Sequence, residues 1–245
     1  MIEIENLIVA YGDHRVLNGL SVAWHNKAIH GLVGMNGAGK TTLLNTMAGF
    51  LKPGSGTILM DGVSLGRTAL SYLETENFFY SNITGREYLG LFSAPAVSQG
   101  IDEWNQLFRL PLDELIEGYS SGMKRKLALA GVLRQEKPLV ILDEPFNGLD
   151  LEASRLLSLI IARLKERGST VLVTSHILGS LTGICDHIHL LSNGKIVLSR
   201  DRENFANLEK EIFRDSDQGY FDLVNNIMPG QENEPGSQGD KRDPV

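Results

Sequence analysis

The sequence predicts an α/β protein with a mostly parallel core sheet, an N-terminal antiparallel β portion and a small α-helical insert. Short apolar runs alternate with helical patterns along most of the chain, which favours parallel strands covered by helices. Two strand-like segments, residues 2–9 and 16–24, flank a turn signal at Gly12 and Asp13 and open the chain in β style. Residues 76–118 instead carry short helical patterns and several aromatic side chains.

These patterns divide the chain into three parts. We expect a core formed by residues 1–75 and 119–213, interrupted by the helical insert at 76–118. An acidic tail follows at 214–245. We expect this tail to be disordered from about residue 229, because the sequence there is rich in Gly, Gln, Glu, Asn, Pro, Ser and Asp.

Composition argues against several classes of protein. The 245 residues are 42% hydrophobic, enough for one large domain or two small ones. The net charge is −7, and residues 201–245 carry −6 of it, with 11 acidic and 5 basic side chains; a nucleic-acid partner is therefore not expected. The single Cys185 fits a reducing compartment. Because the chain lacks a signal-peptide pattern and an apolar run of ~20 residues, we expect a cytoplasmic protein that reaches a membrane only through a partner.

The predicted elements alternate regularly along the chain. A buried strand at 28–33 ends in a glycine-rich loop and precedes a helix at 40–50. Later, Asn193 and Gly194 form a strong hairpin signal. The other expected elements are strand 57–60, helices 85–92, 101–108 and 123–133, strand 139–142, helix 151–167, strand 171–174, and the hairpin strands 188–191 and 195–199.

The glycine-rich loop fits a phosphate-binding pattern. Residues 34–41, GMNGAGKT, match G-x-x-x-x-G-K-[ST] at every fixed position, between a buried strand and a helix. Glycines let backbone N–H groups approach phosphates closely, and the helix N-terminus favours negative charge. Lys40 can reach the β- and γ-phosphates and the Thr41 hydroxyl can bind Mg²⁺. The predicted nucleotide contacts here are Asn36, Gly37, Ala38, Gly39, Lys40, Thr41 and Thr42.

Two carboxylates follow the buried strand at 139–142. In nucleotide enzymes of this topology, the strand end borders the ligand site. Asp143 is suited to hold Mg²⁺ through its water shell, and Glu144 to polarise an attacking water as general base. Alone, such a pair is more often a solvent-facing strand end; beside a phosphate loop, the catalytic interpretation is favoured.

Further motifs in the same order resemble those of the ABC ATPases. The segment YSSGMKR at 119–125 resembles the family signature Leu-Ser-Gly-Gly-Gln, matching at Ser120 and Gly122 and departing at Ser121 and Met123. The segment NGLD at 147–150 and the segment TSH that ends at His176 look like the family's dimer-contact loop and switch histidine. Tyr11 matches the aromatic residue that stacks on adenine, although packing on the core is an equal alternative.

The resemblance covers roughly residues 1–200 and implies a mechanism. ABC ATPases work as head-to-tail pairs, so ATP and Mg²⁺ would lie between the phosphate loop of one subunit and Ser120 and Gly122 of the other. Glu144 would orient water, and the catalytic set would also include Lys40 and His176, which would contact the γ-phosphate. Opening after hydrolysis would drive a membrane subunit docked on the helical insert.

One position departs from the family pattern. The family usually carries Gln, or in some exporters Glu, in the loop that joins the core to the insert. Alignment with exporter-type relatives places Thr75 at this position, flanked by Glu74 and Glu76. A threonine hydroxyl can still bind water or metal, whereas a shift of one residue would present a glutamate. Thr75 or Glu76 is therefore a further candidate Mg²⁺ contact.

The resemblance favours one function over two alternatives. We expect an ATPase subunit that powers an ABC transporter, most similar to the exporter branch, bound to a transmembrane permease at the inner face of the cell membrane. The paired ATPase could be a second copy or a different chain. A soluble ABC ATPase acting as an assembly or regulatory module would share every nucleotide motif. A small-molecule kinase is argued against by the signature-like motif and the switch histidine.

His187 and His189 alternate on a predicted strand and could face one way, like metal ligands. The sequence offers no apparent third ligand, so a metal site is not favoured.

Overall fold

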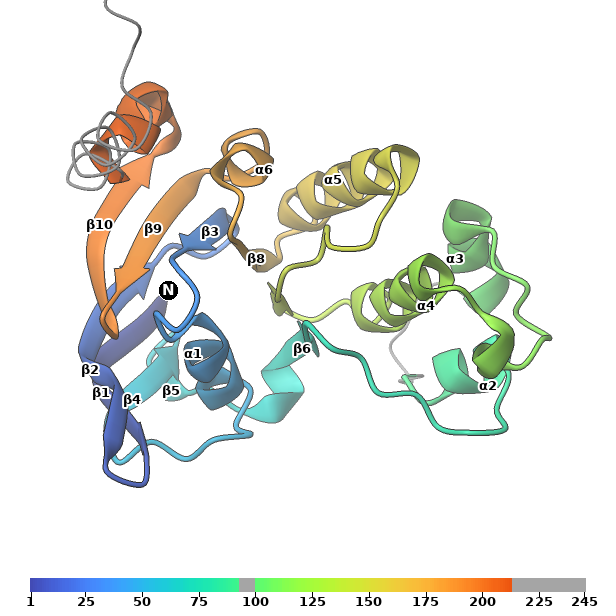
Figure 1. The fold of residues 1–245 in the computed structure, drawn as a ribbon, viewed down its shortest axis with the longest axis horizontal. Coiled ribbons are helices and arrows are strands. Elements are labelled where there is room, and N and C mark those ends of the chain that lie inside the picture. Colours follow the sequence, from blue (N-terminus) through green and yellow to red (C-terminus); the bar gives the residue numbers. More distant parts are fainter. Residues whose placement is uncertain (93–99, 213–245) are drawn as a thin grey trace, which may run out of the picture. The chain divides into compact units, whose positions relative to one another are not determined.

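The computed structural model describes residues 1–92 and 100–212. The chain divides into two units, residues 1–206 and 207–245, of which the second is described only as far as residue 212 (Figure 1). The predicted acidic tail at 214–245 lies outside the described residues, as does part of the predicted insert, residues 93–99. No helix in the described ranges is long and apolar enough to cross a membrane.

A six-stranded sheet forms the centre of the first unit, in the order β10-β9-β3-β8-β7-β6. Strands β9, β3, β8, β7 and β6 run parallel, and β10 pairs with β9 in the antiparallel direction through the predicted turn at Asn193-Gly194. The strands are β3 (Ile29–Val33), β6 (Leu70–Leu73), β7 (Leu139–Leu142), β8 (Thr170–Ser175), β9 (His187–Ser192) and β10 (Lys195–Asp201). Strands β3, β7 and β8 are buried on both faces, as continuous apolar runs predict.

A second, antiparallel sheet has the order β2-β1-β4-β5, and it confirms the β-rich start of the chain. It consists of β1 (Ile2–Tyr11), β2 (His14–Trp24), β4 (Ser55–Met60) and β5 (Val63–Ser64). Residues Tyr11 and His14 are partners at the tight turn between β1 and β2, so this turn carries both side chains on neighbouring strand ends.

Helices occur where the apolar periodicity predicts them, and the polar residues at their ends explain where they begin. Thr84 and Glu87 form a reciprocal capping box at the start of α2, and the Asp150 side chain caps α5. Helices α2, α3 and α4 pack against one another (Figure 1). The helices are α1 (Lys40–Met47), α2 (Gly85–Gly90), α3 (Ile101–Phe108), α4 (Ser121–Leu133), α5 (Leu151–Glu166) and α6 (Leu178–Thr182), with short 3₁₀ turns at Arg67–Ala69, Ile116–Gly118 and Arg202–Asn207.

A single apolar cluster joins the two sheets to α1. Fully buried side chains from β1, from α1 and from the central strands meet in it, among them Ile4, Leu43, Ile141 and Leu172. Burying one such side chain contributes about 1.5–3 kcal/mol, so the cluster holds the start of α1 firmly between the sheets. The loop before α1 is therefore displayed from a rigid support.

Several short elements were not predicted, among them β5, β6 and α6, and helices α1 and α2 are shorter than expected. Helix α1 ends at Met47 rather than residue 50, because Gly49 adopts a left-handed φ of +72°. Helix α6 and strand β6 are each too short to show a periodicity. Strand β6 forms because the neighbouring β7 offers it a parallel partner, and it carries the chain directly to the segment that begins at Glu74.

Candidate nucleotide-binding site

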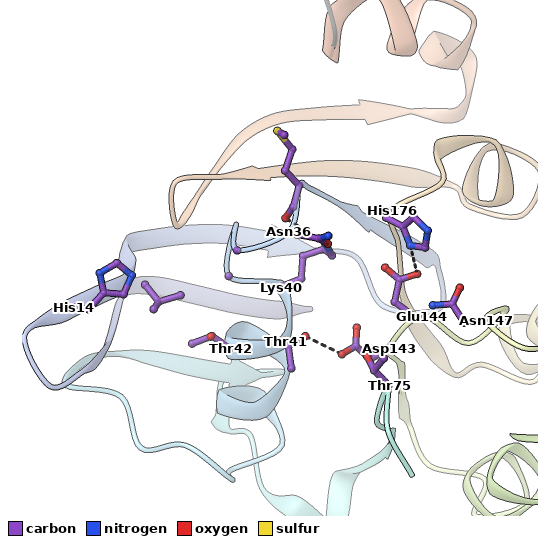
Figure 2. Close-up of a pocket in the computed structure, with 14 residues that line it drawn as sticks. His14, Asn36, Lys40, Thr41, Thr42, Thr75, Asp143, Glu144, Asn147 and His176 are labelled. Atoms are coloured by element: carbon purple, nitrogen blue, oxygen red, sulfur yellow. Dashed lines mark hydrogen bonds and ion pairs between the residues drawn. The ribbon is translucent and has the colours of Figure 1, made fainter. Parts of the chain in front are cut away.

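A cavity of about 590 Å³ opens where β3, β6, β7 and β8 end (Figure 2). Lys40 and Thr41 lie on one side of it, and Asp143, Glu144 and His176 on the other. In parallel α/β sheets, ligands bind outside the carboxyl ends of the strands, so this is the expected place for a site. The lining residues are His14, Val16, Met35, Asn36, Gly37, Gly39, Lys40, Thr41, Thr42, Thr75, Asp143, Glu144, Asn147 and His176.

The phosphate-loop wall is built from backbone. Gly37 and Gly39 adopt φ values of +81° and +106°, a region that side-chain-bearing residues rarely enter. A Cβ on Gly39 would also lie 3.0 Å from the Leu17 side chain, so a larger residue there would have to displace it slightly in addition to adopting the strained φ. Gly39 is the N-cap of α1 and contributes no capping side chain, which leaves N–H groups of the first turn available to an anion.

Lys40 lies across this loop. Its Nζ donates to the backbone oxygen of Gly34 at 2.6 Å, and the residue is 8% exposed. The ammonium group is thus already at the mouth of the loop and can transfer its hydrogen bonds from a carbonyl to a phosphate oxygen. Thr42 and Asn36 line the cavity, whereas Ala38 is buried and is not among the lining residues.

Asp143 connects the phosphate loop to the opposite wall. Its Oδ2 accepts a hydrogen bond from the Thr41 hydroxyl at 3.0 Å, and its Oδ1 accepts one from the Thr174 hydroxyl at 2.5 Å. Asp143 is 1% exposed; its bond to Thr174 is buried, whereas its bond to Thr41 is partly buried at the cavity. A buried carboxylate beside a hydroxyl presents the hard oxygen donors that Mg²⁺ prefers.

Glu144 stands next to Asp143 in an unusual backbone conformation, with φ of +48°. Its N–H donates to the Thr174 hydroxyl at 2.9 Å, and its Oε2 lies 3.0 Å from Nδ1 of His176. The Glu144 side chain is 12% exposed, while that of His176 is 52% exposed at the cavity edge. A carboxylate held beside an imidazole in a phosphate cavity can accept a proton from water.

Thr75 lines the same cavity and Glu76 does not. Asp143 lines that cavity too, and the two side chains overlap in the view of Figure 2. Glu74, one residue earlier, has its pKa raised by burial and, secondly, by the charge of Asp143. The geometry therefore favours the direct alignment, with threonine at this position, over a shift of one residue.

The remaining candidate residues lie outside the cavity. Tyr11 is 51% exposed and does not line it, whereas its cross-strand partner His14 and the nearby Val16 do. Sequence reasoning missed both lining residues, although their position just after the turn next to Tyr11 was a usable signal. Ser120 caps α4, its Oγ accepting from the Met123 N–H at 3.2 Å, and Gly122 lies in the first turn of that helix.

The two strand histidines belong to a separate cluster. The rings of His187 and His189 stack with His30, and Nδ1 of His30 lies 3.1 Å from Nε2 of His189. Burial lowers the pKa of His30 to about 4 and that of His189 to about 3. Across residues 1–92 and 100–212, no group of three or more His, Cys, Asp or Glu side chains is arranged to hold a metal.

Comparison with known proteins identifies the family. Residues 17–147 match the family described as ABC transporter. The bacitracin transport ATP-binding protein BcrA of Enterococcus faecalis is 33% identical over 223 residues, which cover 86% of this chain and 71% of that protein. The lantibiotic transport ATP-binding protein SrtF of Streptococcus pyogenes is 31% identical over 220 residues, covering 87% of this chain and 96% of that protein.

Solved structures of known proteins share this fold. An ATP-binding subunit of an ABC transporter superimposes with a TM-score of 0.75 at 27% identity, covering 91% of this chain and 99% of that one. The ATP-binding cassette MJ0796, solved as a dimer in a post-hydrolysis state bound to ADP and Pi, superimposes with a TM-score of 0.74 at 19% identity and shares the fold over 82% of this chain and 99% of that one. The predicted α/β core of the P-loop type is confirmed. The chain belongs to the ABC transporter family, as an ATP-binding subunit that hydrolyses ATP to power transport across a membrane.

Proposed function

We propose that this chain acts at the cytoplasmic face of a membrane as the ATPase of an exporter, and that two such ATPase subunits enclose ATP between them, head to tail. The observation that carries the proposal is one cavity that joins Lys40 and Thr41 to Asp143 and Glu144. A phosphate cradle, oxygen donors for a metal and a candidate base thus meet in one place, as hydrolysis of a phosphoanhydride requires.

The binding roles follow from position. Lys40 would exchange its hydrogen bond with the Gly34 carbonyl for the β- and γ-phosphates. Thr41 and Asp143, already hydrogen-bonded to each other, would hold Mg²⁺, directly and through its water shell. Mg²⁺ neutralises charge on the phosphates when bound. Thr75, at the same edge, is the further candidate for a metal or water contact. The exposed ring of Tyr11 remains available to stack on a base from the rim.

Glu144 is the proposed general base and His176 its partner. Water would attack the γ-phosphorus as its proton moves toward a Glu144 oxygen. The bond from the γ-phosphorus to the bridging oxygen would break, so that ADP leaves with that electron pair and phosphate is released. The hydrogen bond to His176 orients that carboxylate, and the exposed imidazole is free to turn toward the γ-phosphate. A positioned base contributes typically ~10²–10⁴-fold to such a step.

Ser120 and Gly122 would serve the nucleotide of the second subunit. Their place at the start of α4, outside their own chain's cavity, supports this role, because a helix N-terminus is an anion-binding end. Opening of the pair after hydrolysis would then move the transmembrane permease. Neither a homodimer nor a heterodimer is favoured by these residues.

Export is proposed from the relatives. Those named above serve bacitracin and lantibiotic transport, and their sequences align with most of this chain. A soluble assembly module would share the nucleotide site but would have no permease partner. Purification of the full chain from detergent-solubilised membranes tests this point: a co-purifying multispanning protein supports the transporter, and recovery of the ATPase only from the soluble fraction contradicts it.

The enclosed ATP is tested with Glu144→Gln, which keeps the side-chain shape and removes its basicity. We expect turnover to fall ~10²-fold or more, with ATP still bound and holding two subunits together. Size-exclusion chromatography with light scattering should therefore show a dimer only with ATP. Adding Ser120→Arg should abolish that dimer, because the larger side chain obstructs the partner's nucleotide.

One result would contradict the assignment of the base, and another would decide against a homodimer. If Glu144→Gln hydrolyses ATP at the wild-type rate, Glu144 is not the base. If the variant is inactive but remains monomeric with ATP, the chain does not pair with itself, and an obligate heterodimer replaces the homodimer as the working unit.

A further inference from the structure

A buried arginine connects three segments around the site. Arg125 lies in α4, five residues after Ser120, and is 7% exposed. Its two terminal nitrogens lie within hydrogen-bond distance of five oxygens, four from the backbone and one from a side-chain amide, so the two hydrogens of Nη1 are shared among three acceptors. The acceptors are Glu74 O at 2.8 Å, Thr75 O at 3.2 Å, Asn77 Oδ1 at 2.8 Å, Asp143 O at 2.9 Å and Glu144 O at 2.8 Å.

The two terminal nitrogens of the Arg125 guanidinium donate to different segments. Nη1 donates to the segment at 74–77 that follows β6, and Nη2 donates to the strand end at 143–144. Only a planar fork of donors can serve both segments at once, and lysine would supply a single point charge. Burial lowers the pKa of the guanidinium, and the charges of Asp143 and then Glu144 partly oppose that effect.

Arg125 also acts on the strained residue of the site. The +48° φ of Glu144 is costly for a residue with a side chain, so surrounding contacts must impose it. Thr174 accepts the N–H of Glu144 on one side, and Arg125 donates to its carbonyl on the other. The direction of the Glu144 carboxylate thus depends on a residue in the helix that begins with Ser120.

We propose that Arg125 is a positioning residue: it fixes the backbone of Glu144 and of the Thr75 segment relative to α4, so that displacement of α4 changes the placement of the catalytic carboxylate. The proposal rests on the function assigned to Glu144 above. It makes α4 a mechanical link between the start of the helix, where a second subunit's nucleotide would bind, and the site that hydrolyses the chain's own ATP.

The test is Arg125→Met, which keeps a long side chain and removes every donor. A misplaced base loses rate without losing substrate, so kcat should fall about tenfold to hundredfold while KM for ATP stays within about twofold. Arg125→Lys, with fewer donors, should recover part of kcat. The matched control is Arg134→Met, at the other end of α4, where a 3%-exposed guanidinium donates at 2.7 Å to Leu89 O, away from the cavity. It should lower the thermal midpoint and leave kcat unchanged.

A double variant separates this proposal from the one on which it rests. If Arg125 acts through Glu144, Arg125→Met should reduce the residual rate of Glu144→Gln by less than twofold. Equal kcat losses in Arg125→Met and Arg134→Met, no loss in Arg125→Met, or a multiplicative loss in the double variant would each overturn the positioning role. Full activity of Glu144→Gln would instead overturn the assignment of the base. Because Arg125→Met could fail to fold, the Lys variant is assayed by the same kcat and KM split.

Discussion

The two walls of the nucleotide cavity are built in different ways. The phosphate-loop wall comes from one continuous segment, residues 34–42, whose shape is set by Gly37 and Gly39 at positive φ. The acidic wall combines Asp143 and Glu144 from the end of β7 with groups from β8 and α4. One wall is a local backbone conformation, and the other is an assembly of distant residues.

This difference predicts where each wall is vulnerable. The loop wall needs its own residues and little else, so its failures come from changes within the motif. The acidic wall also depends on Thr174 and Arg125, neither of which lines the cavity. Substitutions outside the site should therefore damage catalysis on the acidic side more than on the loop side.

The largest effect should follow a change within the loop wall. Lys40→Ala removes the positive charge that would lie on the β- and γ-phosphates. We expect kcat/KM for ATP to fall ~10²-fold or more, the scale for loss of one charge-stabilising donor. The exposed Lys52→Ala, just beyond α1, is the matched control and should hydrolyse ATP normally. Phosphate release measures both, and wild-type activity in Lys40→Ala would remove the lysine from the site.

The next largest effect should follow loss of the Thr174 hydroxyl, which supports the acidic wall from outside the cavity. Thr174→Val keeps the volume of a fully buried side chain but deletes the hydroxyl shared by Asp143 and Glu144. Leaving these groups without their partner should cost about 1–3 kcal/mol of unfolding free energy. It should also lower kcat about tenfold, since about 1.4 kcal/mol of lost positioning is a factor of ten. Thr174→Ser, which keeps the hydroxyl, should retain most of both. Equal behaviour of the two variants in denaturation and ATPase assays would show that the hydroxyl is dispensable.

Substitutions of Thr75 test how much the segment that follows β6 contributes to hydrolysis. Thr75→Ala should lower basal ATPase a few-fold, by roughly the worth of one hydrogen bond, and Thr75→Gln should preserve or raise it. Glu76→Ala, whose side chain does not line the cavity, should leave the rate unchanged. If instead Glu76→Ala is the damaging variant, the segment is shifted by one residue when nucleotide binds.

The smallest effect should appear away from both walls, in the histidine cluster. His30 and His189 have pKa values of about 4 and 3, mainly because they are buried. The nearby His187 lowers both pKa values further. Asp186 raises the pKa of His30, and Asp201 raises that of His189, so these two carboxylates partly oppose the effect. An unfolded histidine has a pKa near 6.5, so below that pH the unfolded chain binds more protons.

The neutral, buried histidines therefore make their full contribution to the free energy of unfolding above about pH 6.5. This contribution is lost as the pH falls toward 3–4. His189→Gln should reduce the drop in thermal midpoint between pH 7 and pH 5, measured on the nucleotide-free chain. The exposed His14→Gln should leave the pH dependence unchanged. An unaltered pH slope in His189→Gln would mean that the cluster does not control acid stability.

Many features of the fold and of the candidate site can be predicted from the sequence alone. The phosphate loop, the acidic pair after β7 and most strands and helices could be predicted, because each is a local pattern of glycines, apolar runs and capping residues. Thr75 could be placed only by resemblance to relatives, because β6, Leu-Ser-Tyr-Leu, lacks the continuous apolar run that marks the equally short β7. The expected disorder of the acidic tail from about residue 229 concerns residues outside the described ranges and stays a prediction.

Only the tertiary structure decided how the acidic wall is held. Nothing in the sequence near Thr174 or Arg125 indicates that the first bridges two carboxylate residues or that the second joins three segments. Both lie within or beside segments that resemble family motifs, but those motifs do not name their hydrogen-bond partners, which depend on the strands and helices that become neighbours in the fold. The phosphate loop and the acidic pair are patterns of neighbouring residues, so the sequence shows them directly. The hydrogen-bond partners of a buried polar group instead depend on the fold, because they are the residues that packing brings near it.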